Sequence, residues 1–230
     1  MSKISVKNLD LYYGDFKALK NINLEIEPNK ITAFIGPSGC GKSTLLKSIN
    51  RMNDLVEGCR IDGEILLDGQ NLAGINIRGR YEAGVSYISE DRLSDSLITG
   101  MNISENLVLR EYGKPPFANH SIINKAAIRK NAAEKMKQYQ VRASGKSGID
   151  TLVKLLSGGN QQKVVIAKWL YSDADIYIFD EPTRGIDVGA RDEIYNIMYD
   201  LIAKGASIIM ISSDLVEVLK MSDRVVVMRE

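Results

Sequence analysis

A glycine-rich run followed by a lysine and two hydroxyl residues could hold phosphate groups. Residues 36–44 read Gly-Pro-Ser-Gly-Cys-Gly-Lys-Ser-Thr and fit the pattern G-x-x-x-x-G-K-[ST]. Glycine lets the backbone curl so that its N–H groups point inward at phosphate oxygens. Lys42 is expected to reach the β- and γ-phosphates, and the Ser43 hydroxyl to bind Mg²⁺. The residues expected around the phosphates are Gly36, Ser38, Gly39, Cys40, Gly41, Lys42, Ser43 and Thr44.

Two adjacent carboxylates follow a short apolar run. Asp180 and Glu181 come directly after Ile176–Phe179, and a buried parallel strand presents such residues at its C-terminal edge, where open α/β sheets bind ligands. We expect Asp180 to hold Mg²⁺, directly or through water, and Glu181 to polarise a water for attack on the γ-phosphate. The pair could instead cap the turn at Pro182, but the phosphate-binding pattern favours the catalytic role.

The elements that must position these residues alternate between strands and helices. Apolar residues at every second position predict strands over Ile4–Leu9 and Ile22–Ile26. A strand over Lys30–Ile35 leads into the glycine-rich turn and a helix from about Lys42 to Met52. Further strands are expected over Glu64–Leu67, Val85–Ile88, Asp175–Phe179, Ser207–Ile211 and Arg224–Met228, and helices over Gly159–Tyr171 and Val188–Ala203. This alternation predicts an α/β fold with a parallel sheet covered by helices on both faces.

The middle of the chain has a different character. From about Ser89 to Leu155, segments rich in Ala, Lys and Glu have helical spacing. Residues 113–121 read as a surface loop that holds His120, the one histidine of the chain, which we expect to be solvated. The sequence therefore predicts a core of residues 1–88 and 157–230 with a helical subdomain, residues 89–156, inserted into it.

Composition narrows the class of protein. The chain has 230 residues, 44% hydrophobic and 26% charged, which excludes collagen-like and disordered proteins. A net charge of +1 gives no overall field for nucleic acid or anionic lipid, although a local patch could exist. Cys40 and Cys59 are too few for a disulfide framework or a zinc site, and neither a signal peptide nor a membrane-spanning run is visible. These features predict a cytoplasmic protein.

A third motif lies between the first two. Leu156–Gln162 reads LSGGNQQ, and with it the chain resembles the ATP-binding cassette (ABC) ATPases, whose signature is LSGGQ. The resemblance implies a P-loop NTPase of ABC type: a mostly parallel sheet core, N-terminal antiparallel strands, an inserted helical subdomain, and ATP and Mg²⁺ as ligands. Physically, Ser157 is a good N-cap, and two glycines let a helix N-terminus approach a phosphate closely.

The resemblance also implies roles for single residues. Ser157 and Gly159 would bind the γ-phosphate held by a second copy of the chain, so that two ATP molecules are sandwiched in a head-to-tail dimer. Asp187 matches the aspartate that crosses this interface, although it could also cap the next helix. Tyr13 matches the aromatic that stacks on adenine; it could instead be a core residue, and Tyr12 is an alternative.

Two positions depart from the family pattern. Glu90 stands where a glutamine usually senses Mg²⁺ and the attacking water; a carboxylate can still contact the metal but adds charge beside the γ-phosphate. Ser213 stands where a histidine usually contacts the γ-phosphate. We therefore expect turnover to be slower than in a complete site.

These departures bear on lineage. Residues from about Val6 to Leu72 look like the ATPase of bacterial phosphate importers. From about Ala83 onward the chain looks like the second cassette of bacterial ribose- and galactose-type sugar importers, where Glu and Ser are usual at the two positions. This change suggests the hypothesis of an engineered chimera or a trimmed chain.

The leading prediction is the ATP-binding and ATP-hydrolysing subunit of an ABC importer. It would pair with a second copy of itself and with membrane-embedded permease subunits, lying peripherally at the inner membrane. An alternative is a nucleotide-binding scaffold with little hydrolysis, which Glu90 and Ser213 motivate. A non-transport ABC protein acting on DNA or ribosomes is disfavoured by the neutral charge, so no nucleic acid is expected. The transported substrate is not identified by the sequence.

Overall fold

The chain folds into two compact units. The computed structural model describes residues 2–120, 122–143, 148–171 and 173–229. Contacts group residues 1–87, 173–181 and 198–230 into the first unit, and residues 88–172 and 182–197 into the second. The assignment of an ATP-binding core to residues 1–88 and 157–230, with a helical subdomain over 89–156, stays a prediction.

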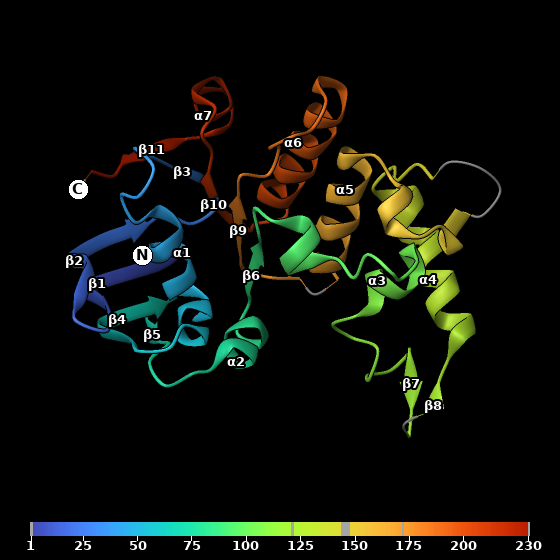
Figure 1. Ribbon diagram of the computed structural model, residues 1–230, viewed down its shortest axis with the longest axis horizontal. Helices are drawn as coiled ribbons and strands as arrows, with labels where there is room; N and C mark the ends of the chain where they lie inside the picture. Colours follow the sequence, from blue (N-terminus) through green and yellow to red (C-terminus); the bar gives the residue numbers. More distant parts are fainter. Residues whose placement is uncertain (1, 121, 144–147, 172, 230) are drawn as a thin grey trace. The chain divides into compact units, whose positions relative to one another are not determined.

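An antiparallel sheet opens the first unit (Figure 1). Its strands are β1 (Ile4–Tyr13), β2 (Phe16–Ile26), β4 (Cys59–Leu67) and β5 (Gln70–Asn71), in the order β2-β1-β4-β5. Ile4 pairs with Ile26 on one side and with Leu67 on the other. Strands β1 and β2 are longer than the sequence predicted, because register shifts after Val6 interrupt the alternation by which strands are recognised.

The second sheet of this unit carries the candidate site. Its order is β11-β3-β10-β9-β6, and β10 runs parallel to both β3 and β9, as β11 does to β3. The strands are β3 (Ile31–Ile35), β6 (Val85–Ile88), β9 (Ile176–Asp180), β10 (Ser207–Ile211) and β11 (Arg224–Val227). The predicted α/β class with a mostly parallel sheet is confirmed.

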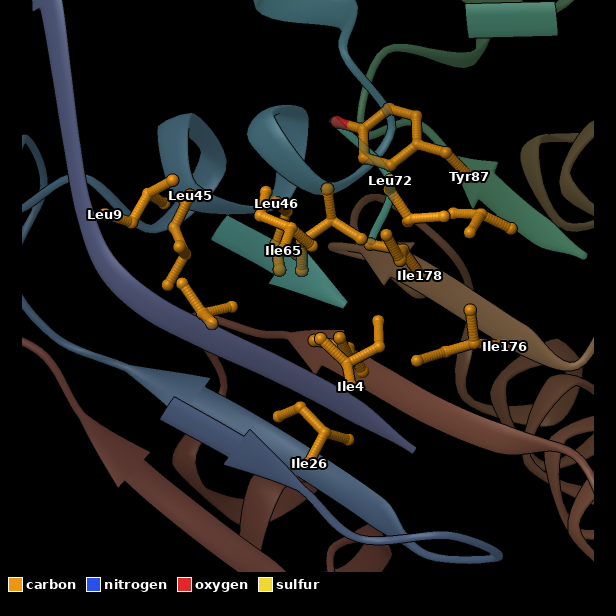
Figure 2. Close-up of a cluster of buried hydrophobic side chains, with 14 of the residues drawn as sticks. Ile4, Leu9, Ile26, Leu45, Leu46, Ile65, Leu72, Tyr87, Ile176 and Ile178 are labelled. Carbon is orange, nitrogen blue, oxygen red and sulfur yellow. The ribbon is translucent and has the colours of Figure 1, made fainter. Parts of the chain in front are cut away.

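Helix α1 joins the two sheets in one core. It spans Lys42–Ile49, shorter than expected because Arg51 takes a left-handed conformation, with φ 63°, at the start of a 3₁₀ turn over Met52–Leu55. Leu45 and Leu46 point into a cluster of buried side chains shared by strands of both sheets (Figure 2). Burial of these apolar side chains, at about 1.5–3 kcal/mol each, fixes the helix beneath the loop that precedes it. The remaining helices of the unit are α2 (Ile77–Glu82) and α7 (Leu215–Met221).

A buried arginine closes the C-terminal end of α1. Arg80 of α2 donates to the carbonyl oxygens of Ser48 and Ile49 at 2.9 and 2.6 Å, and to those of Leu72 and Ile75 at 2.9 and 3.2 Å. Burial lowers the pKa of Arg80 to about 10, so the guanidinium remains charged at neutral pH. It therefore satisfies two of the carbonyls that a helix end leaves unpaired.

The second unit is mainly helical. It contains α3 (Ile103–Val108), α4 (Lys125–Gln138), α5 (Gly158–Trp169), the short turns Arg92–Ser96, Gly148–Asp150 and Val153–Leu155, and a small hairpin of β7 (Ala118–Asn119) and β8 (Ile122–Ile123). The hairpin lies partly in the segment expected as a loop, whose last residue, Ser121, falls outside the described residues. Helix α6 (Val188–Ala203) begins in the second unit and ends in the first. Among the described residues, no helix combines the length and apolarity that crossing a bilayer requires.

Lys168 of α5 leads to a prediction about stability and pH. Its ammonium group is buried and donates to the Ser96 carbonyl, and burial, with the nearby Arg110, lowers the pKa of Lys168 from 10.5 to about 8. Between pH 8 and 10.5 the unfolded chain binds a proton at Lys168 that the folded chain does not. The free energy of unfolding should therefore rise with pH across this range, by a total of about 3 kcal/mol. Urea unfolding followed by the fluorescence of Trp169, the one tryptophan, should show this rise.

The Lys168→Met variant should lack that pH-dependent gain. The exposed Lys130, changed to Met, serves as the matched control and should keep it. Equal slopes of stability against pH in all three proteins would contradict the prediction.

Candidate functional site

The phosphate-binding pattern forms a loop between β3 and α1. Gly39 and Gly41 have φ values of +86° and +91°, a region that L side chains rarely adopt. A Cβ at Gly36 would lie 2.3 Å from the carbonyl oxygen of Met228, so only glycine fits there. Helix α1 follows with its first N–H groups directed back at the loop and without a side-chain cap. This is the arrangement that binds anions at helix N-termini.

The Lys42 side chain folds back onto the start of the phosphate loop. Its Nζ donates to the carbonyl oxygens of Gly36 and Pro37 at 2.7 and 2.8 Å, and lies 3.5 Å from the Cys40 sulfur. The ammonium group is therefore bonded to the backbone of the loop, next to the candidate anion site. Ser43 follows it in the first turn of α1.

Asp180 ends strand β9 with one oxygen paired and the other unpaired. Oδ2 accepts a hydrogen bond of 2.8 Å from the Tyr87 hydroxyl, while the buried Oδ1 makes no hydrogen bond within the described part of the chain. Burial raises the pKa of Asp180, and Tyr87, Lys47 and Ser43 act in the opposite direction. A buried, unpaired carboxylate oxygen beside a serine hydroxyl fits a hard cation that also binds phosphate oxygens, such as Mg²⁺.

Glu181 is held in an uncommon backbone conformation. Its φ is +49°, and its N–H donates to the carbonyl oxygen of Ile211 at 2.9 Å. The Ser213 hydroxyl donates to Glu181 Oε2 at 3.1 Å. Burial raises the pKa of Glu181, and the hydrogen bonds from Ser213 oppose that change. Such a carboxylate is suited to accept a proton.

The two tyrosines of β1 differ in their surroundings. The Tyr13 hydroxyl donates to Asn53 Oδ1 at 2.9 Å, and its partly buried ring packs against the apolar core. Tyr12 lies under the Arg60 guanidinium, whose carbon is 4.3 Å from the ring centre. The core alternative for Tyr13 is thus correct in part, and its stacking on adenine stays a prediction.

In the second unit, the signature residues begin helix α5. Ser157 occupies the N-cap position, but its hydroxyl accepts a hydrogen bond of 2.9 Å from Asn160 instead of capping the backbone. Gly159 is buried, and a Cβ there would lie 2.6 Å from the Cβ of Ala190 in α6. This glycine is therefore required by packing, whatever else it binds.

Asp187 caps helix α6. Its Oδ1 accepts from the Ala190 N–H at 3.0 Å, so the capping alternative is confirmed, and its side chain is exposed. The expected role of Asp187 at a dimer interface stays a prediction.

Glu90 and Arg92 form side-chain contacts with Arg184 and Gln161 within the second unit. The Glu90 carboxylate forms an ion pair with Arg184, a partner that the sequence did not indicate. Arg92 donates from Nη1 to the carbonyl oxygen of Arg184 at 3.1 Å and from Nε to Gln161 Oε1 at 3.4 Å. Sequence reasoning missed Arg92, because its contacts join residues about 70 and 90 positions away.

The site residues thus fall into two groups. The first unit brings together Lys42, Ser43, Asp180, Glu181 and Ser213, and the second holds Glu90, Ser157, Gly159 and Asp187. Within the described residues, no cluster of three or more His, Cys, Asp or Glu side chains could hold a metal by itself.

Comparisons with known proteins agree with this geometry. The family model described as "ABC transporter" matches residues 19–184. The xylose import ATP-binding protein XylG of Thermoanaerobacter pseudethanolicus is 41% identical over 98% of this chain, which spans 43% of that relative. The ribose import ATP-binding protein RbsA of Clostridium perfringens (strain 13) is 39% identical over 99% of the chain, again spanning 43% of the relative. The chain therefore spans less than half the length of these relatives.

Solved structures support the same fold. The crystal structure of a nucleotide-free ATP-binding cassette from an ABC transporter superposes with a TM-score of 0.81 at 23% identity, covering 99% of this chain and 88% of that one. The ATP-binding subunit of an ABC transporter gives a TM-score of 0.75 at 25% identity, covering 99% of this chain and 86% of that one. The predicted fold, a P-loop NTPase of ABC type, is confirmed.

Proposed function

Because the chain belongs to the ABC transporter family, we propose that it hydrolyses ATP as the ATP-binding component of a sugar importer. The observation that carries the proposal is the end of β9. Asp180 there keeps a buried, unpaired oxygen, and Glu181 is held against Ser213 in the unit that contains the phosphate loop. The names of the relatives, which import xylose, arabinose or ribose, support a sugar as cargo.

The residues of the first unit divide the chemistry among them. Lys42 and the N–H groups that begin α1 hold the β- and γ-phosphates. Ser43 and Asp180 are the residues that would hold Mg²⁺, which when bound neutralises charge on the phosphate oxygens. Glu181 accepts a proton from water as the water oxygen bonds to the γ-phosphorus. The bond from that phosphorus to its bridging oxygen breaks, which yields ADP and phosphate.

The second unit supplies the proposed contacts between copies. Ser157 and Gly159 at the start of α5 bind the γ-phosphate of a second copy, and Asp187 crosses the interface. The exposure of Ser157 and Asp187 supports this proposal, because both can reach a partner without refolding. Two ATP molecules are then held between two chains.

Permease subunits are the proposed membrane partner. A cavity of about 550 Å³ lies between α3 and α4, and half of the residues that line it are apolar, including Val108, Tyr112 and Ile128. Exposed apolar surface of this kind is typical of a protein contact. The protein would then lie at the cytoplasmic face of the inner membrane.

The alternative function is a nucleotide-binding scaffold with little hydrolysis. The ion pair of Glu90 with Arg184 favours it, because a carboxylate held by an arginine is less available to Mg²⁺. The contact of Ser213 with Glu181 favours hydrolysis instead. The origin of the chain from two lineages remains a hypothesis, which one continuous native gene would contradict.

Phosphate release tests the proposal. We expect Mg²⁺-dependent release of phosphate from ATP to rise faster than linearly with protein concentration, since two copies build each site. Lys42→Ala should reduce release about a hundredfold, because it removes the charge over the loop. The exposed Lys204, changed to Ala, is the matched control and should keep the wild-type rate. If the folded wild-type protein bound ATP but released no phosphate, the hydrolysis proposal would be rejected in favour of the nucleotide-binding scaffold.

A further inference from the structure

Basic side chains are concentrated in one segment of the second unit. Residues 122–143 hold six basic side chains and one acidic side chain, a net charge of +5, and all of them belong to that unit. The other residues of the chain include 24 basic and 28 acidic side chains, a net charge of −4. The overall charge of +1 therefore does not describe this segment. Its local field can attract an anionic surface within a Debye length, about 10 Å at 0.1 M salt.

Three lysines of α4 provide the charge that is free to bind a partner. Lys125, Lys130 and Lys137 are exposed, and no other side chain that the structure describes forms an ion pair with them. At about 100° per residue, they lie within about 140° around the helix axis. Arg129 lies within the same arc, but Asp150 pairs with it at 2.6 Å. One side of α4 therefore presents positive charge that no carboxylate of the chain neutralises.

Exposed apolar side chains lie beside these lysines. Ile122 and Ile123 of β8 are 75% and 52% exposed, and β8 leads directly into Asn124, the N-cap of α4 (Figure 1). Tyr112, which is 55% exposed, lines the same cavity as Ile123 and Lys125. Apolar side chains next to lysines are stabilised at the boundary between lipid headgroups and acyl chains, whereas nucleic acid is bound mainly through its phosphates. The combination therefore favours a lipid surface over nucleic acid.

We propose that this surface of α4 and β8 binds anionic phospholipid headgroups at a membrane. We call it the basic patch, and its residues are Ile122, Ile123, Lys125, Lys130 and Lys137. The lysines are attracted by the headgroup charge, and the isoleucines enter the boundary between headgroups and acyl chains. The proposal rests on the proposed placement of the protein at a membrane and adds a lipid contact to the one proposed for permease subunits. It requires no nucleotide.

Sedimentation with vesicles tests the proposal on the wild-type chain in the absence of ATP. One set of vesicles contains phosphatidylglycerol and phosphatidylcholine in equal parts, and the other contains phosphatidylcholine alone. We expect the protein to bind the anionic vesicles and to remain unbound with the neutral ones. Raising the salt to 1 M shortens the Debye length to about 3 Å and should release the protein.

The triple variant Lys125→Gln, Lys130→Gln, Lys137→Gln should bind anionic vesicles about a hundredfold more weakly, at about fivefold for each lysine. Glutamine favours a helix about as well as lysine does, so the circular dichroism spectrum should be unchanged. The double variant Ile122→Ser, Ile123→Ser should weaken binding about threefold or more and keep its dependence on salt. The matched control removes three charges from exposed lysines of the first unit, Lys7, Lys20 and Lys204, and should bind as the wild type does.

The other outcomes would overturn the proposal. Equal binding by the lysine variant and its control would mean that overall charge, and not the basic patch, attracts the vesicles. Equal binding to neutral and anionic vesicles, or no binding of the folded wild type to either, would exclude the headgroup contact. Displacement of the vesicles by transfer RNA, which the isoleucine variant binds as tightly as the wild type, would assign the patch to nucleic acid. Wild-type protein that binds anionic vesicles but releases no phosphate from ATP would refute the proposed hydrolysis alone.

Discussion

Replacing Glu181 by glutamine should lower kcat for ATP hydrolysis by about a hundredfold or more and leave ATP binding nearly unchanged. The amide keeps the size of the side chain and can still bond to the Ser213 hydroxyl, which lies 3.1 Å from the carboxylate. It cannot accept a proton from the attacking water. Single-turnover phosphate release, measured beside the Kd for ATP, separates the chemical step from binding.

The matched control is Glu57→Gln, at an exposed carboxylate of the same unit. Its kcat should equal that of the wild type. An active Glu181→Gln protein would show that another group accepts the proton.

The same residue should shape the pH profile. Burial raises the pKa of Glu181, so the carboxylate stays protonated, and inactive as a base, up to a higher pH than an ordinary glutamate. The acid limb of kcat should therefore lie above the usual glutamate range. Ser213→Ala removes a hydrogen bond that opposes this change and should move the limb further upward.

Replacing Arg80 by methionine should lower the free energy of unfolding by about 3–5 kcal/mol. The guanidinium bonds to the carbonyl oxygens of Ser48, Ile49, Leu72 and Ile75. Ser48 and Leu72 keep backbone donors, from Arg51 and Ile75, whereas the Ile49 and Ile75 oxygens lose the donor that Arg80 supplies. Methionine avoids the cost of burying a charge, but we expect the loss of four hydrogen bonds, two of them to carbonyls without a backbone donor, to outweigh that gain. Urea unfolding followed by circular dichroism measures the difference.

Arg80→Lys should recover only part of the lost stability. Its ammonium group can donate to some of the four carbonyl oxygens, but it lacks the planar, forked donor set by which the guanidinium reaches all of them. The exposed Arg78 of the same helix, changed to Met, is the control and should cost less than about 0.5 kcal/mol. Equal midpoints for Arg80→Met and the wild type would contradict the expected role.

The strands of the parallel sheet could be predicted because they are short, apolar and bounded by turns. Strands β1 and β2 could be predicted only in part. Asn8 and Asn21 adopt positive φ values of 48° and 49°, and the register shifts near them break the period of two. A prediction based on alternating apolar residues therefore gives two strands that are shorter than those the backbone forms.

The site shows the same division. Residue spacing was enough to predict the phosphate loop and the acidic pair as candidates, since each is continuous in sequence. The partners of these residues could not be read in the same way: Tyr87 meets Asp180 across 93 positions, and Arg184 pairs with Glu90 in another segment. Such pairs depend on how elements pack, and a charged or hydroxyl side chain carries no local signal of its distant partner.

Gly159 is constrained by packing, apart from the role proposed for it at the γ-phosphate. Helix packing excludes any side chain there, because a Cβ would lie 2.6 Å from Ala190. Even in an organism that gained nothing from ATP hydrolysis, selection for a folded protein would keep this glycine, while the exposed Ser157 could drift. Intolerance of substitution at position 159 therefore does not show that the residue acts in catalysis. Position 157 is more informative: a serine kept under selection for ATP hydrolysis, but lost under selection for folding alone, would indicate a role in nucleotide chemistry.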